Sequence, residues 1–161
     1  MSNILLVCTG NTCRSIMAEE LMDDAVGRSS VLKGMIEVDS AGTFACEGQA
    51  PTDKAEMALE RLGIEMGRHK AKQVSEELVE WADAILVMEA AHVEQMEAMF
   101  PSYEGKISTM IGYANGVYGF PGDTGYDIAD PYGEPLDEYV QCARQLKTII
   151  YKIIENIEKE V

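Results

Sequence analysis

Basic side chains are scarce in this sequence. Its 161 residues contain 13 Lys and Arg against 28 Asp and Glu, which gives a formal net charge of -15. A protein that binds nucleic acid needs a basic face to neutralise phosphates, so nucleic acid is not an expected partner. An anionic ligand would have to be attracted by a local positive pocket, because the field of the whole molecule repels it.

Long apolar runs are also lacking. No run approaches the roughly 20 residues that span a bilayer, so we expect no association with a membrane. The N-terminal Met1-Ser2-Asn3 and the short apolar stretch after it lack the basic region and the small-residue cleavage site of a signal peptide. We therefore expect a cytoplasmic protein.

Cysteine and histidine are few. The sequence contains four cysteines, which are Cys8, Cys13, Cys46 and Cys142. In the cytoplasm these thiols are expected to be mostly reduced. No CxxC pair occurs, and His69 and His92 lie far along the chain from each other and from the cysteines. The sequence therefore predicts neither a metal site nor another cofactor.

Short apolar runs alternate with amphipathic segments along the chain. The predicted strands cover residues 4–7, 35–38, 84–88 and 106–110, and Ser40-Ala41-Gly42 after the second of them is turn-prone. The predicted helices cover residues 15–26, 52–62, 76–81, 90–100 and 136–157, while residues 112–133 read as a long glycine-rich loop. This alternation predicts an α/β three-layer sandwich, with a parallel sheet between helices. The length fits a single domain over residues 1–161, expected to be a monomer or weak dimer.

The segment Cys8-Thr9-Gly10-Asn11-Thr12-Cys13-Arg14-Ser15 joins the first predicted strand to the first predicted helix. Parallel sheets bind ligands at the carboxyl ends of their strands, where this segment lies. Gly10 and Asn11 most readily adopt positive φ, so the loop can curl until successive backbone N–H groups point inward. Such a nest of N–H groups at a helix N-terminus binds anions. The segment is therefore a predicted phosphate loop after the first strand.

This loop carries a nucleophile and a clamp. The helix N-terminus stabilises the sulfur of Cys8 as a thiolate, to which the Ser15 hydroxyl can donate. Arg14 can hold two phosphate oxygens with its planar guanidinium. The arrangement predicts in-line attack of Cys8 on phosphorus and a phosphocysteine intermediate. A Cys-x5-Arg match alone is weak, because a lone Cys is more often a small buried hydrophobe, but the strand–loop–helix context makes it more specific.

A phosphocysteine mechanism needs a general acid for the leaving group and later a base for water. Asp130, in Asp130-Pro131-Tyr132-Gly133, is the candidate, because a loop that carries a free Asp can approach the mouth of the pocket. By itself Asp130 reads as a turn residue, since Asp-Pro favours turns. Its pairing with the phosphate loop gives it a catalytic interpretation.

Four segments resemble, in the same order, those of low-molecular-weight protein tyrosine phosphatases. They are Val7 to Ser15, Asp39-Ser40-Ala41-Gly42-Thr43, Gly63-Ile64 with His69-Lys70-Ala71-Lys72, and Asp130-Pro131-Tyr132-Gly133. The resemblance covers nearly the whole chain. It implies a phosphatase of phosphorylated proteins with a four-stranded parallel sheet, in which Cys8 is the nucleophile, Arg14 the clamp and Asp130 the acid and base.

The resemblance also implies supporting roles. Asn11, Ser40 and His69 would form a buried hydrogen-bond network that holds the loop open, whereas His92 reads as an ordinary surface residue of a predicted helix. Cys13 matches a second loop cysteine that can form a reversible disulfide with an oxidised nucleophile. The residues expected to surround the phosphate are Thr9, Gly10, Asn11, Thr12, Cys13 and Ser15. Those expected to form the substrate wall are Thr12, Phe44 and Tyr132.

Thr12 departs from the tyrosine-specific members, which commonly carry Ile there. A bulky aliphatic side chain packs against an aromatic leaving group, whereas Thr is shorter and offers a hydroxyl. The version in this sequence resembles that of bacterial members that act on phosphoarginine in proteins, while Tyr132 suits either a phenyl ring or a flat guanidinium. The sequence favours phosphoarginine slightly over phosphotyrosine, with a neutral substitution at Thr12 as the alternative.

Two other classes of protein share these features. An arsenate reductase of the same fold needs further cysteines to relay a disulfide, and none lies between Cys46 and Cys142. A silent phosphate-binding module would be expected to have lost Cys8 or Asp130, and both are present. A phosphatase is therefore the favoured reading.

Overall fold

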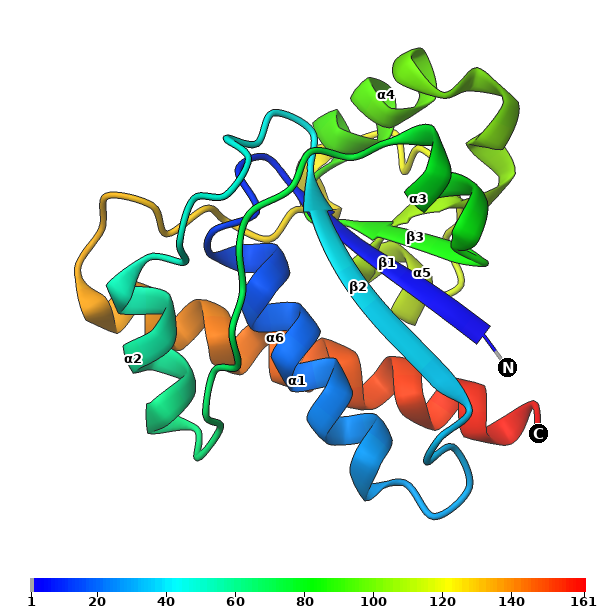
Figure 1. Cartoon of the computed structure of the whole chain (residues 1–161). Helices are drawn as coiled ribbons and strands as arrows, with labels where there is room; N and C mark the ends of the chain where they lie inside the picture. Colours follow the sequence, from blue (N-terminus) through cyan, green and yellow to red (C-terminus); the bar gives the residue numbers. More distant parts are fainter. Residues whose placement is uncertain (1) are drawn as a thin grey trace.

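Figure 1 presents the computed structural model of the protein, which describes residues 2–161. Four parallel strands form one sheet in the order β2-β1-β3-β4. The strands are β1 (Ser2–Cys8), β2 (Ile36–Gly42), β3 (Ala84–Val87) and β4 (Ile107–Thr109). The helices are α1 (Arg14–Arg28), α2 (Asp53–Arg61), α3 (Glu76–Trp81), α4 (Ala90–Met99), α5 (Met110–Ala114) and α6 (Leu136–Lys159), with 3₁₀ turns η1 (Pro101–Lys106) and η2 (Thr124–Tyr126). None of the helices within residues 2–161 is both long and apolar enough to cross a bilayer.

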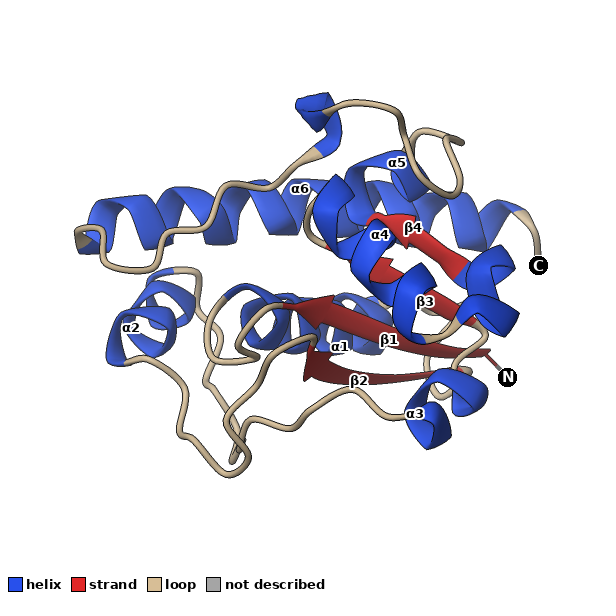
Figure 2. Cartoon of the chain, turned by 90° about the horizontal axis from the view of Figure 1, so that it is seen from above, coloured by secondary structure: helices blue, strands red, loops and turns tan. Residues whose placement is uncertain are grey.

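The side chains of β1 alternate between two hydrophobic cores, because successive residues of a strand point to opposite faces. Ile4 and Leu6 pack in a core that includes α1 and α6, while Leu5 and Val7 pack in a second core with α3 and α4. Helices α1 and α6 lie against each other on one face of the sheet (Figures 1 and 2). The sheet is the middle of three layers, which confirms the predicted α/β sandwich.

At two places the structure assigns a segment to another kind of element than the sequence predicts. Ser40-Ala41-Gly42 does not turn but continues β2, where it pairs with residues 6–8 of β1. Met110 does not end the fourth strand but begins α5, whose cap is Thr109: its Oγ1 accepts a hydrogen bond from Gly112 N at 2.9 Å. The glycine-rich segment 112–133 therefore contains the end of α5 and the turn η2 rather than loop alone.

The phosphate loop lies where the strand order changes direction. From β1 the chain passes to β2 on one side of the sheet and later to β3 on the other side. Loops that leave two neighbouring strands in opposite directions open a crevice at the carboxyl edge of a parallel sheet. Figure 2 shows the arrowheads of β1 and β2 pointing toward the same group of loops. Residues 9–13 leave β1 at this edge.

Candidate active site

The phosphate loop curls around the sulfur of Cys8. Asn11 adopts φ 57°, the only left-handed conformation of a non-glycine residue within residues 2–161, and Asn11 N donates to Cys8 Sγ at 3.3 Å. Gly10, expected to share this conformation, does not have positive φ. Ser15 Oγ lies 3.0 Å from Cys8 Sγ, within hydrogen-bond distance. One backbone N–H and one hydroxyl thus lie within hydrogen-bond distance of the sulfur near the start of α1.

The side chain of Asn11 stabilises its unusual backbone conformation. Its Nδ2 donates to Ser15 Oγ at 2.8 Å and to Ser40 Oγ at 3.0 Å, while Lys72 N donates to its Oδ1 at 3.1 Å. His69 Nε2 donates to Asn11 O at 3.1 Å, since a carbonyl oxygen can only accept. The structure brings Asn11, Ser40 and His69 together; Asn11 and Ser40 are fully buried and His69 is half-buried.

The side chain of Arg14 is buried, and its guanidinium nitrogens have different partners. Its Nη1 donates to Glu89 Oε2 at 2.6 Å and to Ile128 O at 2.7 Å. Its Nη2 lies 3.6 Å from Asp130 Oδ2, and its Nε is buried with no partner among residues 2–161. A buried donor without a partner is costly. The edge formed by Nε and Nη2 makes no hydrogen bond within residues 2–161, although Nη2 forms an ion pair with Asp130, and this edge has the geometry to hold two oxygens of a phosphate.

The guanidinium of Arg14 is permanently charged. Burial alone lowers the pKa of Arg14, but the hydrogen bond to Glu89 and the charges of Asp130 and Cys8 outweigh burial and raise it above its ordinary value. Glu89 begins the turn into α4 and was not predicted from the sequence, because nothing in the local pattern links it to Arg14, 75 residues away. The same holds for the carbonyl of Ile128.

Asp130 lies at the mouth of the pocket. Its Oδ1 accepts a hydrogen bond from Tyr132 N at 3.0 Å and lies 3.7 Å from Cys13 Sγ. Its side chain is 45% exposed, so it can contact a bound substrate. Burial, together with Cys8 and Asp130, raises the pKa of Cys13 to about 12, so Cys13 is a neutral thiol near pH 7.

His92 is the clearest correction to the sequence-based expectation. It is 2% exposed rather than on the surface. His92 Nδ1 accepts from Glu89 N at 3.1 Å, so in the neutral ring the proton is on Nε2, which donates to Thr9 Oγ1 at 2.8 Å. Burial, and after it the charge of Arg14, lowers the pKa of His92. The neutral ring therefore connects the turn into α4 with the phosphate loop.

The site contains a cavity of about 250 Å³. It is lined by Cys8, Thr9, Gly10, Thr12, Cys13, Arg14, Gln49, Asp130 and Tyr132. Of the expected substrate wall, Thr12 and Tyr132 line this cavity, whereas Phe44 lies outside it in a neighbouring hollow. Gln49 is an additional lining residue that the sequence did not single out.

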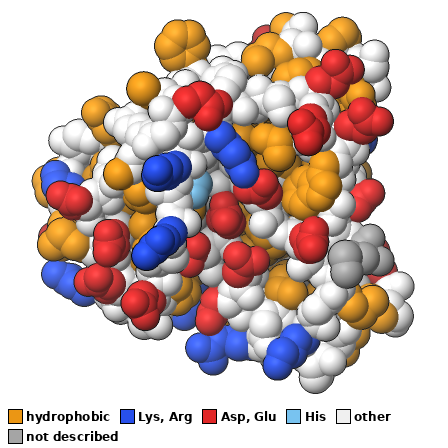
Figure 3. All heavy atoms as spheres, in the orientation of Figure 1, with side chains coloured by type: hydrophobic (Ala, Val, Ile, Leu, Met, Phe, Trp, Pro, Cys, Tyr) orange, Lys and Arg blue, Asp and Glu red, His pale blue; other side chains and the backbone are white. Residues whose placement is uncertain are grey.

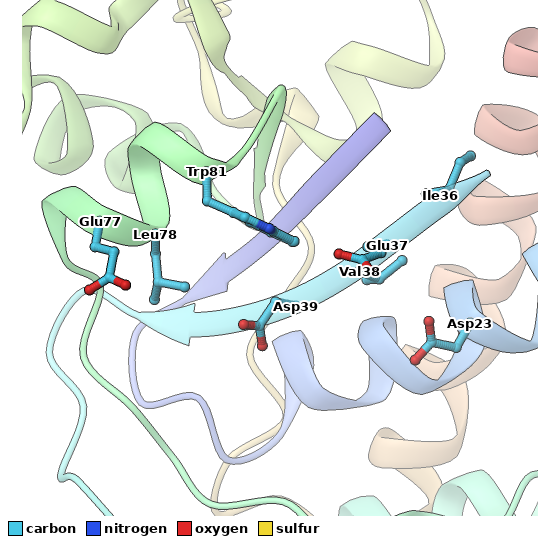
Figure 4. A pocket seen from close by; sticks show the side chains of 8 residues that line it. All are labelled: Asp23, Ile36, Glu37, Val38, Asp39, Glu77, Leu78 and Trp81. Carbon is cyan, nitrogen blue, oxygen red and sulfur yellow. The ribbon is translucent and has the colours of Figure 1, made fainter. Parts of the chain in front are cut away.

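A larger hollow of about 600 Å³ lies elsewhere, along β2 and beside α3 (Figure 4). Four carboxylates line it, those of Asp23, Glu37, Asp39 and Glu77, and it shares no residue with the cavity at Cys8. Acidic side chains also predominate over basic ones on the molecular face seen in Figure 3. A phosphate would be repelled by this hollow, whereas the smaller cavity contains the cationic side chain of Arg14 and is the one suited to an anion.

Known proteins have the same fold and are similar to this chain over most of its length. A protein-arginine-phosphatase of Geobacillus stearothermophilus is 37% identical over 157 residues, which cover 98% of this chain and 97% of that protein. The structure of YwlE arginine phosphatase from the same species has a TM-score of 0.87 at 35% identity and covers 99% of this chain and 95% of its own. A low molecular weight protein tyrosine phosphatase from T. tengcongensis has a TM-score of 0.84 at 37% identity, with 97% and 99% covered.

The family model for low molecular weight phosphotyrosine protein phosphatases matches residues 3–161, nearly the full length. The four sequence segments, the four-stranded parallel sheet and the loop around Cys8 all agree with that match. The chain therefore belongs to the low molecular weight phosphotyrosine protein phosphatase family and is a protein phosphatase.

Proposed function

We propose that this phosphatase hydrolyses phosphoarginine in proteins, with Cys8 as nucleophile, Arg14 as phosphate clamp and Asp130 as general acid and base. The observation that carries the choice of phosphoarginine is Thr12. It lines the same cavity as Cys8 and Asp130. Its carbonyl oxygen accepts a hydrogen bond from Thr52 Oγ1, whereas its hydroxyl has no side-chain partner within residues 2–161. A free hydroxyl at the wall suits the N–H groups of a guanidinium better than the edge of a phenyl ring.

The first step transfers the phosphoryl group to the enzyme. The Cys8 thiolate attacks phosphorus in line, the P–N bond breaks, and Asp130 gives its proton to the departing guanidine nitrogen. The Nε and Nη2 of Arg14 and backbone amides of the loop hold the equatorial oxygens, while Asn11 N donates to the Cys8 sulfur. Anchoring of Nη1 by Glu89 and Ile128 keeps the guanidinium oriented while this charge shifts.

The second step releases the phosphate. Water attacks the phosphorus of phosphocysteine, Asp130 accepts its proton, and the P–S bond breaks to return the Cys8 thiolate. Ser15 Oγ, 3.0 Å from the sulfur, can donate to the thiolate as it leaves. Inorganic phosphate then departs through the open mouth beside Tyr132, which is 67% exposed.

The relatives support the proposal but include both activities. The Geobacillus stearothermophilus relative is called a protein-arginine-phosphatase, and the T. tengcongensis structure is called a protein tyrosine phosphatase. Phosphotyrosine is the second candidate, since the exposed ring of Tyr132 can stack on an aromatic leaving group. A cytoplasmic location fits both, because a nucleophilic thiolate beside Cys13 needs a reducing compartment.

The experiment compares kcat/KM for two peptides of the same sequence, one with phosphoarginine and one with phosphotyrosine. We expect faster hydrolysis of the phosphoarginine peptide and loss of both activities in Cys8→Ser. A phosphotyrosine preference in the native enzyme would assign it to the second candidate. Undiminished activity of Cys8→Ser would refute the assignment of Cys8 as the nucleophile.

A further inference from the structure

A second hollow lies beside the phosphate pocket. It has a volume of about 450 Å³ and is lined by Thr9, Thr43, Phe44, Gln95, Ala98 and Met99. We call it the Thr9 groove. Thr9 lines both the groove and the cavity at Cys8, so the two are separated by one residue of the phosphate loop. A substrate bound at Cys8 therefore passes close to the groove.

The groove exposes large apolar side chains. Phe44 is 87% exposed and Met99 is 43% exposed, and no charged residue is among the lining residues. Apolar side chains gathered around a hollow, in a chain with a net charge of -15, are typical of a contact surface for another molecule. The lining combines the apolar Phe44, Ala98 and Met99 with uncharged polar residues, so the occupant is expected to be uncharged and mainly apolar.

Both walls of the groove are fixed to the phosphate loop. On one side Phe44 N donates to Thr9 O at 2.9 Å, and Thr43 N donates to Cys8 O at 2.9 Å. On the other side His92 of α4 donates to Thr9 Oγ1 at 2.8 Å. The backbone of the groove is thus held at a set position from Cys8, so an occupant does not need to order that backbone.

We propose that the Thr9 groove binds an aliphatic side chain of the substrate protein, from a residue next to the phosphorylated one; this rests on the proposed action on phosphorylated proteins. When a phosphorylated side chain enters the cavity, its main chain remains at the rim. Consecutive Cα atoms are about 3.8 Å apart, so the residues next to the phosphorylated one lie over the adjoining surface. On the side of Thr9 that surface is apolar, so an aliphatic neighbour is favoured over a polar one.

The test uses two phosphorylated peptides that differ only in the residues flanking the phosphorylated one, which are Leu in the first and Ser in the second. Burial of a Leu side chain in an open groove is expected to raise kcat/KM by roughly tenfold. Met99→Ser should reduce this Leu preference to about threefold or less, because it removes one apolar wall. Ala98→Leu should reduce it as well, by filling the groove without adding a polar group.

The controls separate the groove from the chemistry. Hydrolysis of p-nitrophenyl phosphate, which has no flanking residues, should be unchanged in Met99→Ser and Ala98→Leu. Met57→Ser, at a methionine of similar exposure on α2, should keep the full Leu preference. The peptides are made with phosphoarginine and with phosphotyrosine, so the Leu to Ser ratio tests the groove whichever residue is hydrolysed faster. Equal rates on the Leu and Ser peptides, or an unchanged ratio in both groove variants, would overturn the proposal.

Discussion

Among single residues, Arg14 shows how one side chain is held and used at once. Glu89 and Ile128 O bind Nη1, while the edge formed by Nε and Nη2 makes no hydrogen bond within residues 2–161. Without Glu89 the guanidinium would lose its strongest charged partner and could rotate away from the position needed by the phosphate.

Glu89→Ala is therefore expected to lower kcat/KM by roughly tenfold to a hundredfold, which corresponds to about 1.4–2.8 kcal/mol. Glu89→Gln, which keeps one acceptor oxygen, should lose less. Glu94→Ala, at an exposed glutamate within α4, serves as the control, and its kcat/KM should be unchanged. Steady-state kinetics with p-nitrophenyl phosphate measures the effect, and equal activities of Glu89→Ala and Glu94→Ala would refute the anchoring role.

The role of Asp130 predicts a dependence on the leaving group. Asp130→Ala should slow hydrolysis of phosphopeptides strongly, by roughly 10²–10⁴-fold, because their leaving groups need a proton. Hydrolysis of p-nitrophenyl phosphate, whose leaving group is stable as an anion, should be slowed much less. Equal losses on both substrates would contradict the general-acid assignment.

The central residues of the site could be predicted from the sequence because they are local to a motif. Cys8, Asn11 and Arg14 lie within seven positions of one another, where spacing and a strand–helix junction carry the information. Glu89 and His92 could not, because their partners lie about 75 and 83 positions away and are fixed only by the packing of α4. The one available signal was the position of Glu89 and His92, two polar residues that follow the predicted third strand at the carboxyl edge of the sheet, where ligands bind.

For the secondary-structure elements, the position of β2 determines the shape of the phosphate loop. The turn expected at Ser40-Ala41-Gly42 was wrong because pairing with β1 and burial outweigh the turn preference of these residues. Gly42 lies so close to the loop that a Cβ atom there would be 2.4 Å from Thr9 O. A glycine is therefore required by close approach of two backbones rather than by a turn.

Gly42→Ala is expected to displace the phosphate loop and to reduce kcat/KM at least tenfold, with a lower midpoint of urea unfolding. Gly27→Ala is the matched control. Gly27 lies in α1, where an added methyl group would meet no other part of the protein within 4 Å beyond its own stretch of helix, so the variant should gain about 0.5–1 kcal/mol of stability. Activity assays and urea titrations of both variants measure these effects. Full activity of Gly42→Ala would show that the two backbones can separate without cost.

In the whole molecule, the excess of acidic residues affects stability through the buried carboxyl group of Glu19. Glu19 is packed between α1 and β2, where its Oε1 accepts a hydrogen bond from Ser40 Oγ at 2.5 Å. Burial, and after it the charges of Asp39, Asp23 and Glu20, outweigh that hydrogen bond and raise the pKa of Glu19 to about 7. The folded protein therefore binds a proton at Glu19 at a higher pH than the unfolded chain does.

Because this pKa is raised on folding, the stabilising contribution of Glu19 is complete below about pH 4.5 and is lost as the pH rises through about 7. Glu19→Gln, which keeps the acceptor for Ser40, should remove this loss. The free energy of unfolding of the variant should exceed that of the native protein by about 2 kcal/mol more at pH 8 than at pH 5. Urea unfolding at both pH values gives the difference, and the same difference at both would contradict the prediction.

The claim that most needs testing is the preference for phosphoarginine, which depends on Thr12. The measurement is the ratio of kcat/KM for phosphoarginine and phosphotyrosine peptides of identical sequence, in the native enzyme and in Thr12→Ile. The bulkier aliphatic side chain removes the free hydroxyl and packs against an aromatic ring, so the ratio should shift toward phosphotyrosine by roughly tenfold or more. A ratio that is the same in both enzymes would contradict the role assigned to Thr12.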